Sequence, residues 1–269
     1  MTSPDAKLPA RATPPDLRAD VLLVTAVPCE LKAIKSAAKS LDLRWDRQHG
    51  EVTEYRNLGL VGDLRVVAIQ LGSMGSFSAA GSAFTCYRAM IETRATSVLA
   101  VGIAFGIDES RQQEGDVLVS EVLHLYDEVD VIDEGDSYRY AYPERAVVRA
   151  SERWVERFQR SVTTLPAMAT PPREVHVGRL LAGGARIESR AFRAELVARV
   201  GDGDPPVVGG EMEAAGIAAA CAATNAEWIV VKAVSDFATR ESRLRIAEHR
   251  DKAASAAALF VLETLRSGW

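Results

Sequence analysis

The sequence is poor in the features that mark secreted, disulfide-bonded and membrane proteins. Its three cysteines, Cys29, Cys86 and Cys221, lie far apart in 269 residues and form neither a disulfide framework nor a CxxC motif. This cysteine usage favours a reducing compartment, which we take to be the cytoplasm. No signal-peptide pattern precedes Val21, and no later apolar run is long enough to cross a membrane. We therefore expect neither a secreted nor a membrane protein.

Positive charge and the common cofactor motifs are also scarce. The 32 Lys and Arg against 37 Asp and Glu give a net charge of -5, which argues against a nucleic-acid partner. The four histidines show no HExxH or paired spacing, so we expect no metal site. Neither glycine-rich turn carries a G-x-G-x-x-G or P-loop signature, and no G-x-S-x-G elbow is present. A small-molecule enzyme without metal or organic cofactor, or a protein-binding module, fits this composition better.

Apolar segments of strand length alternate with segments of helical period from Asp20 onward. This alternation predicts an α/β fold in which helices cover a mostly parallel sheet. Four prolines near the start predict a flexible leader over 1–19, followed by one domain over 20–269. Strands are expected at 21–27, 51–58, 64–71, 97–104, 116–126, 174–182 and 228–234. Helices are expected from 28 to 41, from the 72–76 turn to 94, and over 144–160, 189–200, 214–224 and 245–266. The pair 51–58 and 64–71 suggests an antiparallel hairpin and hence a mixed sheet.

Acidic side chains lie near the ends of predicted strands. Glu30 falls in the first turn of a helix, Glu213 precedes another helix, and Asp236 ends a buried strand. Taken singly, each is more typical of a helix terminus or a turn. The carboxyl ends of the strands in an open α/β sheet share one rim, so the three acids and the turns at Gly72 and Gly102 should line one crevice. Their convergence favours a functional site.

Several short motifs are distributed between residue 24 and residue 237. They are VTAVPCE at 24–30, GSMG at 72–75, VGIAFG at 101–106 with GDVLVS at 115–120, GEMEAA at 210–215, and VSDF at 234–237. Together they resemble the nucleoside phosphorylase and nucleosidase superfamily, and most closely its methylthioadenosine/adenosylhomocysteine nucleosidase-like hydrolases. The resemblance spans about residue 21 to the C-terminus. It implies a single-domain three-layer α/β/α fold with a twisted mixed central sheet, and a homodimer or hexamer.

The resemblance also implies roles for residues in these motifs. Asp236 would be the general acid that protonates the purine leaving group, and Glu30 the base that activates water on the opposite face of the sugar. Glu213 would hold the ribose diol, with Met212 packed against the ribose. Further substrate contacts are expected from Gly75, Ile103, Phe105, Ile187, Glu211 and Ser235.

The surroundings of Glu30 distinguish hydrolysis from phosphorolysis. Family phosphorylases bind phosphate with arginines after the first strand and before the V-G turn, whereas 27–30 and 99–102 contain none here. A glutamate beside the nucleophile would also repel phosphate. Water is therefore the expected nucleophile. A phosphate-dependent purine nucleoside phosphorylase and a non-catalytic nucleotide-sensing module of a larger assembly stay open as alternatives.

The residues around the substrate depart from the methylthioadenosine nucleosidase pattern. Ile103 and Phe105 replace small or polar residues, and Arg186 lies near the usual position of an aromatic that stacks on the base. Arg186 is thus a candidate phosphate ligand, although an arginine beside a glycine turn is more often solvated. Arg243 belongs to a mixed-charge cluster that is expected on an exposed helix face. The predicted activity is hydrolysis of the N-glycosidic bond of a purine, adenine-type nucleoside or nucleotide.

Overall fold

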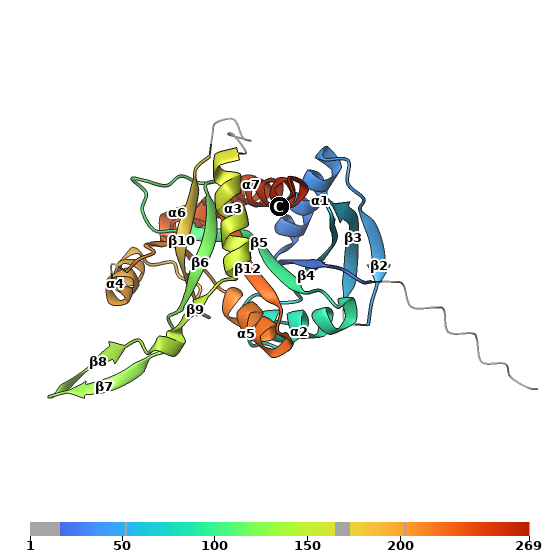
Figure 1. Ribbon diagram of the computed structural model, residues 1–269. Coiled ribbons are helices and arrows are strands. Elements are labelled where there is room, and N and C mark those ends of the chain that lie inside the picture. Colours follow the sequence, from blue (N-terminus) through green and yellow to red (C-terminus); the bar gives the residue numbers. More distant parts are fainter. Residues whose placement is uncertain (1–16, 52, 165–172, 202, 269) are drawn as a thin grey trace, which may run out of the picture.

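A mixed sheet of ten strands forms the centre of the computed structural model, which describes residues 17–51, 53–164, 173–201 and 203–268 (Figure 1). Its main path runs β11 (Val207–Glu211), β10 (Val175–Ala182), β6 (Val117–Leu125), β12 (Glu227–Asp236), β5 (Ser97–Gly106), β1 (Val21–Thr25), β4 (Leu64–Gln70), β3 (Glu54–Val61) and β2 (Asp46–His49). The tenth strand, β9 (Val147–Arg149), pairs with β6. The central strands are continuous runs of Val, Leu, Ile and Ala because helices cover both of their faces.

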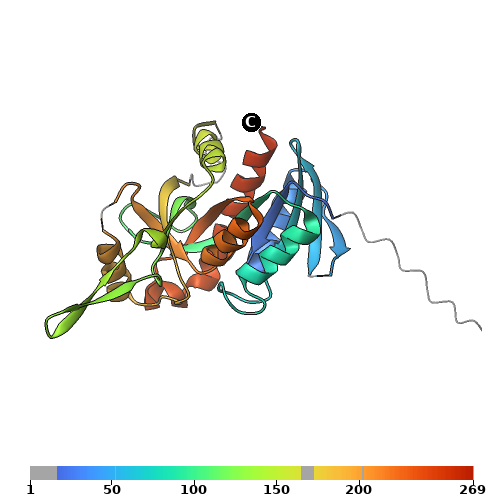
Figure 2. The same cartoon turned by 60° about the horizontal axis from the view of Figure 1, so that its bottom comes forward.

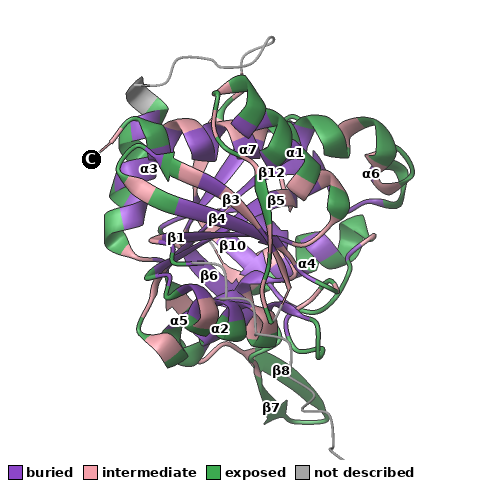
Figure 3. Ribbon diagram, turned by 90° about the vertical axis from the view of Figure 1, so that its right-hand side faces the viewer, coloured by how far each residue is buried: buried purple, intermediate pink, exposed green. Residues whose placement is uncertain are grey.

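Helices cover both faces of this sheet and confirm the three-layer α/β/α arrangement. One layer contains α1 (Pro28–Ser40), α3 (Glu152–Thr164) and α7 (Ile246–Arg266), and the other contains α2 (Ser82–Thr93) and α5 (Ala214–Thr224), above and below the sheet in Figure 1. Two further helices, α4 (Arg190–Val200) and α6 (Arg240–Leu244), lie near one end. Buried residues concentrate on the sheet and the helix faces toward it (Figure 3). No helix among the described residues is both long and apolar enough to cross a membrane.

Part of the sheet closes on itself through β11. This strand pairs with β10 on one side and, antiparallel, with β5 on the other, opposing Gly210 to Phe105. Glycine is required at this crossing, because a Cβ on Gly209 would overlap the Phe105 carbonyl and the Leu118 side chain. The strands β5, β12, β6, β10 and β11 therefore form a closed ring, and the ends of β11 and β5 meet.

The helix predicted over 144–160 is wrong in its first half. Residues Glu144–Ala146 form a 3-10 turn and Val147–Arg149 form β9; only α3 is helical. The reason is a tertiary pairing. Strand β6 continues beyond the stretch that pairs with β12, and β9 satisfies the backbone groups of that extension.

Other element boundaries also differ from the predictions. The strand expected over 51–58 is β3, shifted to Glu54–Val61, and it pairs with β2 (Asp46–His49), which was not predicted. The hairpin of β7 (Asp130–Glu134) with β8 (Ser137–Ala141), which projects from the rest of the structure in Figure 2, was not predicted either. The helix expected at the 72–76 turn begins only at Ser82, since the preceding loop is closed by its own hydrogen bonds, such as that from Ser82 N–H to the Gly75 carbonyl. Of the predicted leader, residues 1–16 lie outside the described residues, and Leu17 and Ala19 are buried in the core.

His124 on β6 is a buried polar side chain. The residue is only 3% exposed, neither ring nitrogen has a hydrogen-bond partner among the described residues, and the ring packs edge-on against Tyr142 with ring centroids 4.4 Å apart. Burial, aided by the positive charge of Arg179, lowers the pKa of His124 to about 4. The folded protein therefore keeps this imidazole neutral at pH values where the unfolded chain protonates it.

The low pKa of His124 predicts a loss of stability in mild acid. The folded pKa lies below the unfolded value near 6.5, so this contribution is present above pH 6.5 and is lost as pH falls toward 4. Between pH 7 and pH 5 it should lower the free energy of unfolding by about 2 kcal/mol. Urea unfolding of wild type and His124→Phe at both pH values measures this, with exposed His49→Phe as control. Equal pH dependence in wild type and His124→Phe would contradict the prediction.

Candidate active site

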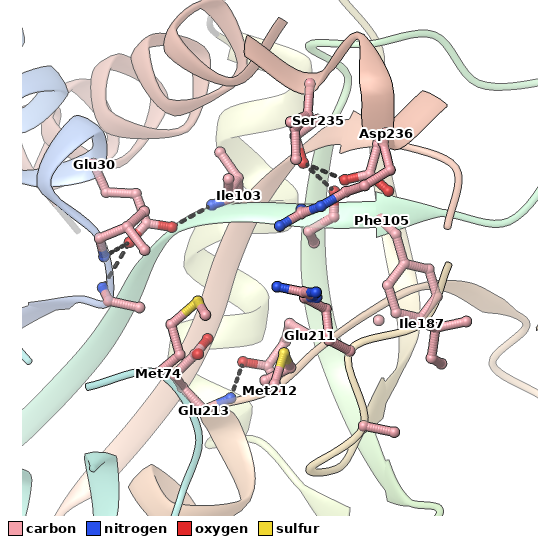
Figure 4. A pocket seen from close by; sticks show the side chains of 18 residues that line it. Glu30, Met74, Ile103, Phe105, Ile187, Glu211, Met212, Glu213, Ser235 and Asp236 are labelled. Atoms are coloured by element: carbon pink, nitrogen blue, oxygen red, sulfur yellow. Dashed lines mark hydrogen bonds between the residues drawn. The ribbon is translucent and has the colours of Figure 1, made fainter. Parts of the chain in front are cut away.

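One pocket brings the sequence-predicted side chains together at the ends of β5, β11 and β12 and the start of α1 (Figure 4). Its cavity volume is about 100 Å³, and the pocket opens to solvent at its mouth. Its lining includes Glu30, Ile103, Phe105, Arg186, Ile187, Glu211, Met212, Glu213, Ser235 and Asp236. Gly75 lies behind this lining and contributes its backbone N–H, which donates to Glu213 at 3.2 Å.

Glu30 is held in place by three backbone donors. Its Oε2 accepts hydrogen bonds from the N–H groups of Ala26 at 2.6 Å and Val27 at 3.0 Å, and its Oε1 accepts one from Ile103 at 2.8 Å. Burial raises the pKa of Glu30, although the positive charge of Lys232 and the backbone donors act in the opposite direction. The carboxylate is thus rigid and more basic than one in water, and it can accept a proton.

Lys232 lies on β12 within an apolar run and forms the charged centre of the site. Its ammonium donates to Glu213 Oε2 at 2.8 Å and to Glu211 Oε2 at 3.1 Å, and all three side chains are buried. Glu211 also accepts hydrogen bonds from the N–H groups of Glu213 and Ala214. Burial opposes the charge of Glu213, but the Lys232 ammonium outweighs it and lowers the pKa of Glu213. An ionised acceptor is therefore fixed beside the pocket.

Asp236 ends β12 in a tight, hydrogen-bonded turn. Its Oδ1 accepts from the Ala238 N–H at 2.8 Å, and its Oδ2 lies 3.0 Å from the Ser235 hydroxyl. Ala238 itself adopts a left-handed conformation, with φ of 50°. The buried guanidinium of Arg193 donates to the Phe237 carbonyl and holds the same turn. Burial raises the pKa of Asp236 against these two hydrogen bonds, so this carboxyl retains a proton more readily than one in water.

Apolar side chains line the space between these acids. Phe105 packs directly over Gly210, where a Cβ would overlap its ring. Figure 4 shows Ile187 beside Phe105, and Met74 with Met212 on the side of Glu213. Such surfaces can contact the faces of a base and a sugar, while the carboxyls contact their polar edges.

This architecture has known counterparts. A family model described as the phosphorylase superfamily matches residues 20–266. The chain belongs to the phosphorylase superfamily. Solved structures with the same fold include nucleosidases, and the fold and the family predicted from the sequence are thereby confirmed.

Two solved structures illustrate how similar the fold of this superfamily member is to known enzymes. The 5'-methylthioadenosine/S-adenosylhomocysteine nucleosidase of Neisseria meningitidis, in complex with methylthio-immucillin-A, is 21% identical with a TM-score of 0.72, covering 92% of this chain and 98% of its own. Futalosine hydrolase of Helicobacter pylori is 15% identical with a TM-score of 0.72, covering 93% and 97%. At these identities the likeness concerns the fold alone.

A similar sequence comes from the sponge Amphimedon queenslandica. It is described as a death domain-containing ATP nucleosidase and is 27% identical over 267 residues, covering 91% of this chain and 48% of its own length. The chain thus spans about half the length of this relative.

Arg186 and Arg243 both line the pocket of this superfamily member. The prediction that Arg243 lies on an exposed helix face is therefore only partly correct. The Arg243 side chain is 33% exposed and forms an ion pair with Glu188 at 3.4 Å. Arg186 pairs with the same carboxylate oxygen at 3.1 Å and is 57% exposed. The sequence did not reveal this bridge, because α6 is too short to show a helical period.

Lys232, Met74, Glu188 and Arg243 lie at the pocket but were not predicted as site residues. A lysine inside an otherwise apolar strand is itself a signal, because a buried ammonium requires an anionic partner. Met74 lies within the GSMG motif, whereas Glu188 and Arg243 have no such local signature. No three His, Cys, Asp or Glu side chains in the described ranges are arranged to hold a metal ion.

Removing the Lys232 charge should strongly destabilise the protein. In Lys232→Met, Glu211 and Glu213 stay buried without their cation, which is expected to lower the free energy of unfolding by about 3–5 kcal/mol. Lys32→Met is the control, because Lys32 is 75% exposed and its pair with Asp251 should contribute less than about 1 kcal/mol. Urea denaturation measures both. Similar small losses in the two variants would show that the buried ions do not depend on Lys232.

Proposed function

We propose that the chain hydrolyses the N-glycosidic bond of a purine nucleoside or nucleotide of adenine type. The observation that carries this proposal is the placement of two buried carboxyls, Glu30 and Asp236, in one pocket, with the ionised Glu213 fixed beside them. An acid and a base on the two sides of a scissile bond are what inverting glycoside hydrolysis requires. The names of the structural relatives, a nucleosidase and a hydrolase, support the same reaction class.

Asp236 acts as the general acid in this mechanism. Purine anions are poor leaving groups, so a proton must reach a ring nitrogen while the sugar develops oxocarbenium character. Burial raises the pKa of Asp236, so this carboxyl holds its proton to a higher pH than one in water. The turn held by Ala238 and Arg193 fixes the direction in which the carboxyl faces.

Glu30 acts as the general base. Each carboxylate oxygen has two lone pairs, and within the described part of the chain Oε1 accepts only the Ile103 N–H, which leaves a lone pair for a proton from water. The raised pKa strengthens it as a base. Attack from this side places the water opposite the departing purine, as displacement at the anomeric carbon requires.

Glu213 accepts the ribose diol. Its ionisation is favoured by Lys232, and two charge-assisted hydrogen bonds to the hydroxyls would fix the sugar between Glu30 and Asp236. Met212 packs on the ribose, and Phe105, Ile103 and Ile187 enclose the base. Two of the relatives are named for adenosine-containing substrates, which supports adenine as the base.

The site favours water over phosphate as the nucleophile. Among the described residues, the cation whose charge lowers the pKa of Glu30 is Lys232, and Glu211 and Glu213 already engage it. A phosphate anion beside Glu30 would therefore meet net negative charge. A cytoplasmic location and a homodimer or hexamer complete the proposal.

Turnover should not require phosphate. In phosphate-free buffer the protein should release free adenine and free sugar from adenosine or AMP, because Glu30 supplies the base that activates water. Chromatography of the base and analysis of the sugar measure both products. A strict requirement for phosphate together with a sugar 1-phosphate product would establish a phosphorylase instead.

Asp236→Asn should lower kcat about a hundredfold or more, because the amide cannot supply the proton. Substrate binding, measured by calorimetry, should largely survive, and the alkaline limb of the pH–rate profile that reflects Asp236 ionisation should disappear. Asp46→Asn on the exposed β2 is the matched control. An Asp236→Asn variant with wild-type kcat would remove this residue from the mechanism.

A further inference from the structure

Two arginines at the pocket share one carboxylate oxygen. Glu188 Oε1 lies 3.1 Å from Arg186 Nε and 3.4 Å from Arg243 Nε, and both arginines line the pocket. The three side chains are partly open to solvent, with exposed fractions of 57% for Arg186, 35% for Glu188 and 33% for Arg243. The bridge therefore leaves a net positive charge at a position that a ligand can reach.

The arrangement of these cations suits a phosphate group. Two guanidinium groups converge on a single anionic oxygen, and guanidinium is the side chain that best matches phosphate in shape and charge. A phosphate presents several such oxygens and more negative charge than a carboxylate. It can thus compete with Glu188 for both arginines, while Glu188 limits the cost of holding two cations close together.

The stereochemistry of a nucleotide leads its phosphate toward this side of the pocket. In a β-nucleotide, C5′ and the base project from the same face of the ribose, and in the anti conformation the 5′ substituent lies near C8, next to the ring nitrogen N7. Asp236 lines the same pocket as Arg186 and Arg243, and the charges of Arg243 and Glu188 both act on its ionisation. Glu30, on the opposite face of the sugar, is thereby kept apart from the phosphate charge.

We propose that Arg186 and Arg243 bind the 5′-phosphate of a nucleotide substrate in competition with the Glu188 carboxylate. This inference rests on the proposed glycosidase function and narrows its substrate class from nucleosides to nucleotides. The role of Arg186 is then electrostatic recognition at the position where stacking on the base was expected from the sequence. Arg243, from α6, supplies the second half of the clamp.

The ratio of kcat/KM for AMP to that for adenosine tests the proposal. The ratio cancels any effect on chemistry that the two substrates share, including an effect of Arg243 on Asp236. Arg186→Ala and Arg243→Ala should each lower the ratio about tenfold or more, the usual scale for a lost charge-assisted hydrogen bond. Glu188→Gln should raise it, because the competing charge is gone. ATP in place of AMP reports whether further phosphates add to the effect.

Arg190→Ala is the matched control. Arg190 is the first residue of α4. It is 62% exposed and pairs with Glu109 at 2.8 Å, and it is not among the residues that line the pocket. The Arg190→Ala substitution removes the same charge, but it should leave the AMP-to-adenosine ratio of kcat/KM within about twofold of the wild-type ratio, since exposed ion pairs contribute little. An equal fall of the ratio in Arg190→Ala and Arg186→Ala would reduce the effect to general surface charge and overturn the clamp.

Other outcomes separate this inference from the proposed function. If wild type releases adenine from adenosine and not from AMP, or if the arginine variants lose both activities alike, the phosphate clamp is wrong and the glycosidase stands. If no substrate releases base, the glycosidase is wrong, and calorimetry of AMP and adenosine with the Asp236→Asn protein still tests the clamp. Inorganic phosphate added to the adenosine reaction should yield no sugar 1-phosphate, which distinguishes a 5′-phosphate subsite from a nucleophile site.

Discussion

The buried ammonium of Lys232 is the interaction on which the pocket depends. Glu30, Glu211 and Glu213 are all less than 7% exposed, and burying three carboxylates without a cation would be prohibitively costly. The single positive charge of Lys232 is shared by two of them through direct hydrogen bonds and acts on the third through space. Its position in the middle of β12, opposite Gly102 of β5, fixes this charge within the central part of the sheet. Glu213 accepts a hydrogen bond from Lys232, and its pKa is lowered. Glu30 senses Lys232 only through its charge, and burial keeps the pKa of Glu30 raised.

Glu30 shows how one carboxylate serves both the fold and the site. It accepts the N–H groups of Ala26 and Val27 at the start of α1, as a first-turn acid commonly does at the N-terminus of a helix. Its third donor, Ile103, belongs to β5, and the adjacent Gly102 is required because a Cβ there would overlap the carboxylate. The structural and the proposed catalytic interpretations of this residue are therefore compatible. The helix terminus holds the base in place before any substrate binds.

The limits of prediction can be traced to particular residues. Glu30, Glu213 and Asp236 could be singled out because acids at strand ends, together with the family motifs, have a local signature. The structure of 144–149 could not be predicted, because β9 in this segment pairs with β6 rather than continuing a helix. Arg243 was expected on an exposed face, since its sequence neighbours are charged. Its contact with Glu188, more than fifty positions earlier, depends on how α6 folds back over the pocket.

The sequence by itself determined the alternation of strands and helices, the superfamily and the acids of the pocket, because periodicity and residue chemistry are encoded within each segment. Only the tertiary structure decided how those acids meet. An open sheet would bring together the ends of β1, β4, β5 and β12, which run parallel, but β11 runs antiparallel to β5. Closure of β11 onto β5 brings Glu211 and Glu213 to Lys232. That closure is a pairing between residues more than a hundred positions apart, and it requires the close backbone approach that Gly209 and Gly210 permit.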